Sequence, residues 1–236
     1  MISVIFPCYN EIENIDKNNE ILRNFFNKNK DLEIIFVDNG SSDKLSEYIK
    51  NEFKEFTNVS LIIIEHNKGY GHGIYQGIKK AKYNIVAWMH ADFQVSLKDL
   101  RKGCDLYIKN KNLLNEKIFV KSKRKNRNLL DNIFTFFMSL ITTILFFKKI
   151  NDINSTPNII NKNIFNSIKN IPNDFSFDLF CYILSINHGY KIIRYDVKYL
   201  IRKYGNSKWN FNFKSKIFLS FKMLTYIFKI RFYGLK

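Results

Sequence analysis

Three kinds of residue or signal are scarce in this chain. It has only 3 Cys in 236 residues, and Cys8, Cys104 and Cys181 lie too far apart for a redox or metal-binding motif. This favours buried thiols in a reducing compartment over a disulfide scaffold. The apolar run Ile2–Phe6 is too short for a secretory signal peptide. Acidic residues are few, with 21 Asp+Glu against 38 Lys+Arg.

The resulting formal net charge of +17 implies an anionic partner. Nucleic acid, a phosphorylated substrate and an acidic lipid surface are all compatible with the charge alone. Nucleic acid is the weakest of the three, because the aromatic residues lie mainly in apolar runs and no RNA-binding motif is present. The 46% hydrophobic content and 23 Phe are ample for one domain with its own core.

The first half of the chain alternates short apolar runs with helical periodicity. This pattern predicts an α/β domain built on a mostly parallel, doubly wound sheet, with the polar loops after the strands gathered at one edge. The expected strands are 3–6, 32–37, 60–65 and 85–89, and the expected helices are 12–29, 44–56, 74–81 and 97–110.

The stretch Val86–Gln94 is the most informative of these strand ends. Asp92 and Gln94 lie at positions i and i+2, so they point the same way if the chain stays extended. Two oxygen ligands on one side can hold a divalent cation, with water and a diphosphate completing its shell. The alternative is a helix start, in which Ser96 caps the next helix and Asp92 only solvates the loop.

A glycine-rich turn, Gly69–Gly73, precedes the helix expected from Ile74. It lacks the Lys-Ser/Thr pair of a P-loop, and Ile74 replaces the third Gly of a dinucleotide fingerprint. Glycine here allows either the close approach of a ligand near a helix N-terminus or close helix–sheet packing.

Five motifs in order resemble those of family 2 glycosyltransferases, and most closely those of the dolichyl- or polyprenyl-phosphate sugar synthases. The motifs are Phe6-Pro7-Cys8-Tyr9-Asn10-Glu11, Val37-Asp38-Asn39-Gly40-Ser41-Ser42-Asp43, Asn67-Lys68-Gly69-Tyr70-Gly71, His90-Ala91-Asp92-Phe93-Gln94 and Arg202-Lys203-Tyr204-Gly205-Asn206-Ser207-Lys208. The resemblance implies a GT-A-like domain and an inverting transferase that uses a nucleotide-sugar donor.

The resemblance also implies roles for single residues. The donor nucleotide would lie against Pro7, Tyr9, Glu11, Asp38 and Gly71, and Asp92 and Gln94 would hold Mg²⁺ or Mn²⁺. The sequence departs from the family pattern where His90 and Asn39 replace Asp. His90 removes a negative charge beside the metal, so it would contact the ribose or ligate Mn²⁺; a catalytically inactive homologue is the alternative.

In the second half, a strand is expected at 116–120, followed by the basic cluster Lys121–Arg127. Lys123 and Arg124 occupy the position where the family binds the acceptor phosphate, although such a cluster is also compatible with a solvated face. Asp174 precedes an expected helix at 175–186, where a capping carboxylate and a catalytic base are both possible. Together with Asp174, Arg202 and Lys208 are the predicted catalytic residues; the latter two lie in a loop suited to phosphates.

Two apolar stretches raise the question of a membrane. The uncharged run Ile133–Phe147 is either a core helix or a helix in the membrane interface, and its basic flanks favour the interface. Lys214–Lys236 combines apolar residues at helical spacing with interleaved Lys and Arg, which is typical of a helix on an anionic bilayer; docking on the core is the alternative.

The sequence therefore predicts a GT-A domain over residues 1–212, with a donor half at 1–115 and an acceptor half at 116–212, and a membrane-associating tail at 213–236. The expected acceptor is a polyprenyl phosphate at the cytoplasmic face of the membrane, and the alternative acceptor is a hydroxyl of a glycan or lipid.

Overall fold

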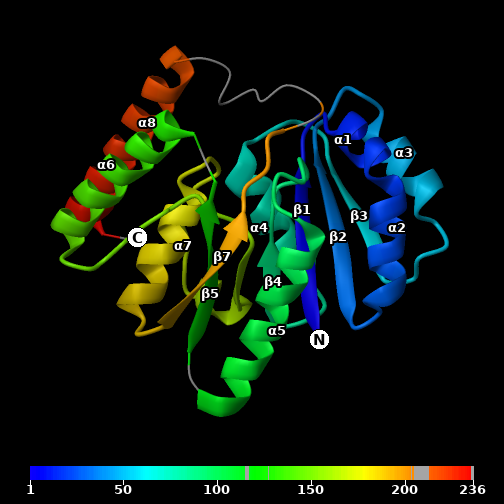
Figure 1. Cartoon of the computed structure of the whole chain (residues 1–236), viewed down its shortest axis with the longest axis horizontal. Helices are drawn as coiled ribbons and strands as arrows, with labels where there is room; N and C mark the ends of the chain where they lie inside the picture. Colours follow the sequence, from blue (N-terminus) through cyan, green and yellow to red (C-terminus); the bar gives the residue numbers. More distant parts are fainter. Residues whose placement is uncertain (115–116, 127, 203, 205–212, 235–236) are drawn as a thin grey trace.

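The architecture is a central sheet with helices on both faces and a pair of helices, α6 and α8, at one end (Figure 1). This computed structural model describes the whole chain except residues 115–116, 127, 203, 205–212 and 235–236. Seven strands lie in the order β3-β2-β1-β4-β6-β5-β7. Each neighbouring pair is parallel except that β6 runs antiparallel to β4 and β5. The predicted mostly parallel sheet is confirmed.

The first half follows the predicted alternation. Its strands are β1 (Ile2–Cys8), β2 (Leu32–Asn39), β3 (Val59–Ile64) and β4 (Ile85–Trp88), and its helices are α1 (Ile12–Lys17), α2 (Asn19–Lys28), α3 (Leu45–Glu52), α4 (Tyr70–Lys80) and α5 (Leu97–Leu114). The single helix expected at 12–29 is divided at Asn18. The Asn18 side-chain amide donates to the Asn14 carbonyl oxygen at 2.7 Å, so it competes with the helical backbone for that acceptor.

Successive residues of the buried strands serve two cores, because side chains alternate across a sheet. In β1, Val4 and Phe6 pack under α1, α2, α3 and α5, whereas Ile5 faces the layer that contains α4 and α7. Both faces of β1 and β2 are therefore covered, and this explains their almost unbroken apolar sequences.

The second half contains β5 (Ile118–Lys125), α6 (Leu129–Phe146), β6 (Asn158–Asn161), a 3₁₀ turn η1 (Lys162–Phe165), α7 (Phe177–Asn187), β7 (Lys191–Lys198) and α8 (Phe213–Tyr233). The sequence predicts a polar loop at 151–157 followed by a helical stretch that ends near Pro172. This prediction is wrong for 158–161, which form β6. This four-residue strand is too short to show a period of its own, and its partners in β4 and β5 lie far away in the sequence.

Helix α6 buries two polar side chains and exposes most of its apolar side chains. Ser139 and Thr142 are buried, and the Ser139 hydroxyl accepts a hydrogen bond from the Asp152 backbone N–H. Leu129, Leu130, Ile133, Phe136, Phe137, Leu140 and Ile144 are exposed. The core-helix alternative for this stretch is therefore wrong. Within the described residues, α6 is the one helix long and apolar enough to cross a membrane.

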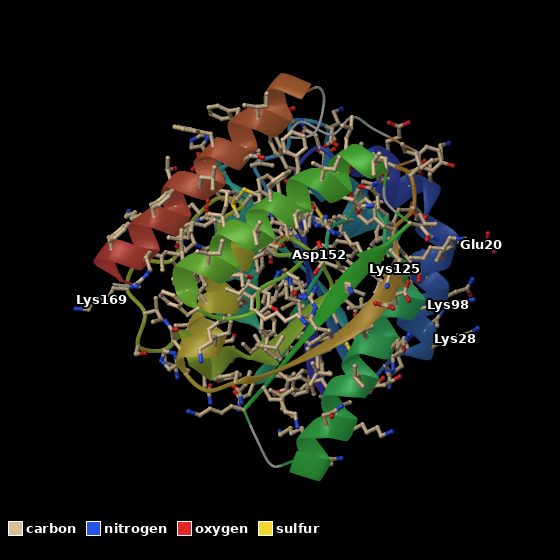
Figure 2. The ribbon with its side chains drawn as sticks, turned by 60° about the vertical axis from the view of Figure 1, so that its left-hand side comes forward. Glu20, Lys28, Lys98, Lys125, Asp152 and Lys169 are labelled. Atoms are coloured by element: carbon tan, nitrogen blue, oxygen red, sulfur yellow. The ribbon has the colours of Figure 1, made fainter. Side chains whose placement is uncertain are left out.

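Helix α8 lies beside α6 (Figures 1 and 2) and uses both of its sides. Met223, Ile227 and Ile230 join the core that contains α7. The opposite side exposes Phe218, Phe221, Phe228 and Phe232. The two neighbouring helices thus both expose apolar side chains. We call these exposed residues of α6 and α8, named above, the α6–α8 surface.

Candidate active site

The loops that follow β1 and β2 are joined to each other by hydrogen bonds and form one unit. The Asn10 N–H donates to the Ser41 hydroxyl at 2.9 Å, and the Ser42 N–H donates to the Asn10 side-chain oxygen at 2.8 Å. Asp43 accepts the Ile12 N–H at 3.0 Å and so satisfies the first turn of α1. Sequence reasoning did not single out Asn10, Ser41 or Asp43, because each acts on a residue about thirty positions away.

Asp38, a predicted nucleotide contact, is buried within this unit. One carboxylate oxygen accepts the Ser41 N–H at 2.9 Å, and the other accepts the Ser46 hydroxyl. In this structure Asp38 organises the loop that follows β2. Pro7 and Tyr9 are partly exposed at the end of β1, and Pro7 lies beside Gly73 at the start of α4.

The position of β1 in the sheet defines the crevice. β1 pairs with β2 on one side and with β4 on the other, so the direction of chain progression reverses there. Ligands of open α/β sheets bind at such a reversal, beyond the carboxyl ends of the strands. Glu11 follows β1 and Asp92 follows β4, so these two carboxylates belong to the switch point.

Arg202, which follows β7, reaches both of these carboxylates. Its Nη2 lies 2.8 and 3.0 Å from the two oxygens of Glu11, and its Nη1 lies 3.7 Å from Oδ2 of Asp92. Burial raises the pKa of Glu11, and the Asp92 charge adds to that effect, while Arg202 opposes it. The structure thus brings three predicted site residues from distant parts of the sequence into one mostly buried ion cluster.

Asp92 and Gln94 have different surroundings. The Gln94 amide oxygen accepts the Tyr199 hydroxyl at 2.8 Å, and its amide nitrogen donates to the Leu200 carbonyl at 2.9 Å. Gln94 therefore holds the segment after β7 against the site. Asp92 accepts the Gln94 N–H on Oδ1 and directs Oδ2 toward Arg202.

The chain's own donor set for a divalent cation is small. Across the residues that the structure describes, no group of three or more His, Cys, Asp or Glu side chains could hold a metal. Asp92 supplies a carboxylate of the kind that Mg²⁺ or Mn²⁺ prefers, and such cations commonly take their other ligands from substrate phosphates and water. The residues fit a cation that arrives together with a diphosphate.

His90 is held in an aromatic stack. The Tyr70 ring lies 4.9 Å from the His90 ring and 4.8 Å from the Phe175 ring, measured between centroids. The Tyr70 hydroxyl donates to buried Asp178 at 3.3 Å, and Asp178 also accepts from Trp88 Nε1 at 2.9 Å. The stack orients the imidazole. Local sequence patterns could not indicate it, because its members come from distant parts of the chain.

Gly71 has a packing reason to be glycine. A Cβ at Gly71 would lie 2.3 Å from the Pro172 carbonyl oxygen and 2.8 Å from the Asp174 carbonyl oxygen. At Gly69, whose φ is +106°, a Cβ would lie 2.4 Å from the Asn173 oxygen. The glycine-rich turn thus lets the 172–174 segment pack closely against the start of α4.

Asp174, the candidate base, is paired with a cation from α8. Lys222 Nζ lies 2.9 Å from Oδ2, and the Ser176 N–H donates to Oδ1 at 2.9 Å. Burial alone would raise the pKa of Asp174, but the hydrogen bonds from Lys222 and Ser176 outweigh it and lower the pKa. The carboxylate is therefore stabilised in its charged form.

The predicted acceptor-phosphate residues differ in availability. Arg124 is mostly buried and donates to Asp152 from Nε at 2.9 Å and from Nη2 at 2.5 Å, while Lys123 is exposed. Figure 2 marks Asp152 near α6, whose Ser139 accepts the Asp152 N–H. Lys208 lies outside the described residues.

A fully buried lysine, Lys121, lies next to this pair. Its ammonium donates to the Ser155 carbonyl and to the Asn158 side-chain oxygen, both at 2.9 Å. Burial lowers the pKa of Lys121 to about 7, although Asp178 opposes the shift. In the unfolded chain a lysine pKa is about 10.4.

Lys121 should therefore make stability depend on pH. Between about pH 7 and pH 10 the unfolded state binds one more proton than the folded state, so stability rises with pH. Urea unfolding should show the free energy of unfolding of the wild type rising relative to that of Lys121→Met by roughly 1 kcal/mol per pH unit from pH 7.5 to 9. A constant offset between the two proteins over that range would contradict the assignment.

Comparison with known proteins places the chain in a class. Residues 3–168 match the profile of Glycosyl transferase family 2. The chain is 28% identical over 222 residues to CsbB of Bacillus subtilis, a protein named as a glycosyltransferase. This alignment covers 90% of the chain and 63% of CsbB. Over 92 residues, 39% of this chain and 21% of the relative, it is 35% identical to the poly-beta-1,6-N-acetyl-D-glucosamine synthase of Staphylococcus aureus. The chain thus spans less than two thirds of either relative.

Solved structures agree in fold. The glucosyl-3-phosphoglycerate synthase of Mycobacterium tuberculosis, crystallised with Mn²⁺, UDP and its product, aligns with a TM-score of 0.73 at 15% identity, over 98% of this chain and 79% of that one. S. aureus TarS (residues 1–349) aligns at 0.59 with 18% identity, over 84% of this chain and 60% of that one.

The order and directions of the strands are those of the GT-A fold of glycosyltransferases. Within that class, the chain belongs to glycosyltransferase family 2.

Proposed function

We propose that the chain transfers a sugar, with inversion, from a nucleotide-sugar donor to a polyprenyl phosphate at the cytoplasmic face of a membrane. The acceptor oxygen forms a bond to the anomeric carbon as the bond from that carbon to the nucleoside diphosphate breaks. The observation that carries the proposal is the convergence of Glu11, Asp92 and Arg202 at the switch point of a family 2 domain.

The donor side rests on the geometry of the β1 and β2 loops. These loops are fixed to each other through Asn10 and Asp43, and they leave Pro7 and Tyr9 partly exposed for a base and ribose. The mycobacterial neighbour has the same fold and was solved in complex with UDP, which supports a nucleoside diphosphate here.

Asp92 would hold the divalent cation, with Gln94 nearby, and the mycobacterial neighbour's Mn²⁺ supports that cofactor. When bound, the cation supplies positive charge against the departing diphosphate. Glu11 would add a second negative charge on the protein side of the site, and Arg202 would pair with the diphosphate. His90, which stacks on Tyr70, would contact the donor from the same loop as Asp92.

The acceptor assignment rests on Asp174. A hydroxyl acceptor needs a base in the transition state, and a base is most effective when its pKa is near the working pH. The lowered pKa of Asp174 and its ion pair with Lys222 make it a weak base. A phosphate acceptor is already ionised and needs none, so the Asp174 environment favours the lipid phosphate.

Transfer to a hydroxyl of a glycan or lipid is the second candidate. Its specific support is the match to the poly-beta-1,6-N-acetyl-D-glucosamine synthase, which covers 39% of this chain. Incubating the protein with a panel of nucleotide sugars and either a short polyprenyl phosphate or a glycan, followed by mass analysis of the products, distinguishes the two.

A membrane location is part of the same proposal, and the α6–α8 surface supports it. The surface is apolar and is flanked by exposed Lys148, Lys149, Lys229 and Arg231. Apolar side chains with cations beside them suit the interface of an anionic bilayer.

Removing two aromatic side chains from this surface should weaken vesicle binding. We expect Phe218→Ser/Phe221→Ser to reduce co-sedimentation with anionic vesicles several-fold, and high salt to release much of the wild type. These side chains are exposed, so the core contacts of α8 remain intact. Ile21→Ser/Ile63→Ser, which removes exposed apolar groups from α2 and β3, is the matched control and should bind like the wild type. Equal binding of all three proteins would contradict a role for the surface.

A further inference from the structure

Arg202 has an unusual position for a residue expected to contact phosphates. Its Nη2 is bonded to both oxygens of Glu11 at 2.8 and 3.0 Å, and its Nε donates to the Tyr204 carbonyl at 2.9 Å. Its Nη1 faces Oδ2 of Asp92 at 3.7 Å. All three side chains of this cluster are 16% exposed, so water screens the charges only partly.

The contact of Arg202 with Glu11 and Asp92 reduces the electrostatic repulsion between these two carboxylates. Glu11 and Asp92 come from neighbouring strands β1 and β4 and converge at the same crevice, where two carboxylates repel each other. A guanidinium between them offsets the repulsion and offers the fork geometry that suits carboxylates.

The same contact conflicts with metal binding. A divalent cation held by Asp92 would share that carboxylate with Arg202, so two cations would face one another in a site with little water. The guanidinium and the metal ion are therefore alternatives at Asp92, unless an anion such as a diphosphate enters with the metal.

We infer that Arg202 is an internal counter-ion that occupies the cation position between Glu11 and Asp92 and competes with the divalent metal until a diphosphate arrives. The diphosphate then provides the charge that draws Arg202 away from the carboxylates and onto its own oxygens. This inference rests on the proposed nucleotide-sugar site, and it adds that metal and nucleoside diphosphate bind in a mutually dependent way.

The inference makes an opposed pair of predictions for one variant. Arg202→Met keeps much of the side-chain length and removes the charge. Mn²⁺ alone should bind this variant roughly 5- to 10-fold more tightly than the wild type, because its competitor is gone. UDP in the presence of saturating Mn²⁺ should bind it more weakly by a similar factor, because a phosphate contact is lost. Arg202→Lys, which keeps the charge, should stay near the wild type for Mn²⁺ alone.

Binding of Mn²⁺ can be followed by the loss of the electron paramagnetic resonance signal of the free ion, and UDP binding by titration calorimetry. Arg101→Ala is the matched control, since Arg101 in α5 also bridges two carboxylates, at 2.7 Å from Asp31 and 2.9 Å from Asp105. It should change neither affinity. Thermal unfolding of each variant verifies folding.

A folded Arg202→Met protein that binds Mn²⁺ no more tightly than the wild type would overturn the inference, as would weaker binding of both Mn²⁺ and UDP. Absence of measurable Mn²⁺ binding in every variant would also overturn it. The test needs no acceptor and no turnover. Opposed shifts in Mn²⁺ and UDP affinity without transfer to polyprenyl phosphate would therefore support the counter-ion role and reject only the proposed acceptor.

Discussion

Asp92→Ala is expected to lower sugar transfer at saturating donor by roughly two orders of magnitude or more, the scale of losing a charge partner in a transition state. Asp92 follows β4 at the switch point and directs one oxygen into the site, facing Arg202 at 3.7 Å. In the proposed reaction it holds the cation that offsets charge on the departing diphosphate. Initial rates with and without added Mn²⁺ or Mg²⁺ measure this effect.

The control for this experiment is Asp105→Ala, which removes an exposed carboxylate from α5 and should leave the rate unchanged. A chelator in excess should abolish wild-type activity to the same extent as Asp92→Ala does. Undiminished transfer in the chelator, or near-normal rates in Asp92→Ala, would refute metal-assisted departure of the diphosphate at this residue.

The second large effect concerns Arg202 and Asp174 measured side by side. With a lipid phosphate acceptor, catalysis depends on cations that bring two anionic substrates together, so Arg202→Ala should lose most of the activity. Asp174→Asn should keep at least about a tenth of it, because a base is not required. Asn retains an oxygen that can accept the Ser176 N–H, so the local turn is preserved.

With a hydroxyl acceptor, Asp174→Asn should instead cause a large loss of activity. General-base catalysis contributes about 10²–10⁴-fold, so Asp174→Asn would then be as damaging as Asp92→Ala. Comparing kcat for the two variants, with folding verified by thermal unfolding, decides between the acceptors. Lys222→Met offers a further readout: freed from its ion pair, Asp174 should become a stronger base, which would raise the rate only if a proton must be removed.

Much of the fold followed from local sequence patterns. Short apolar runs such as Leu32–Val37, each ending in polar residues, located the first strands, because a buried strand must be apolar and must stop where the chain turns. The same patterns placed Glu11, Asp38 and Asp92 at strand ends, and strand ends of a parallel sheet share one edge. The family assignment came from motifs that lie entirely within such segments.

Contacts between distant residues could not be read in this way. The Arg202–Glu11 ion pair spans 191 positions. Arg124, a candidate phosphate ligand, is instead buried in an ion pair with Asp152. The four residues of β6 became a strand because β4 and β5 supply its hydrogen bonds on either side.

The sequence by itself determined which chemical groups this protein carries at the ends of its strands, since burial patterns and turns are set by neighbours along the chain. Only the tertiary structure decided how those groups are used. The 172–174 segment packs against Gly71, Asp174 forms an ion pair with Lys222, and Arg202 lies between two carboxylates. The physical reason is that charge pairing and close packing depend on distances in space, and the chain fixes those distances only when its sheet and helices assemble.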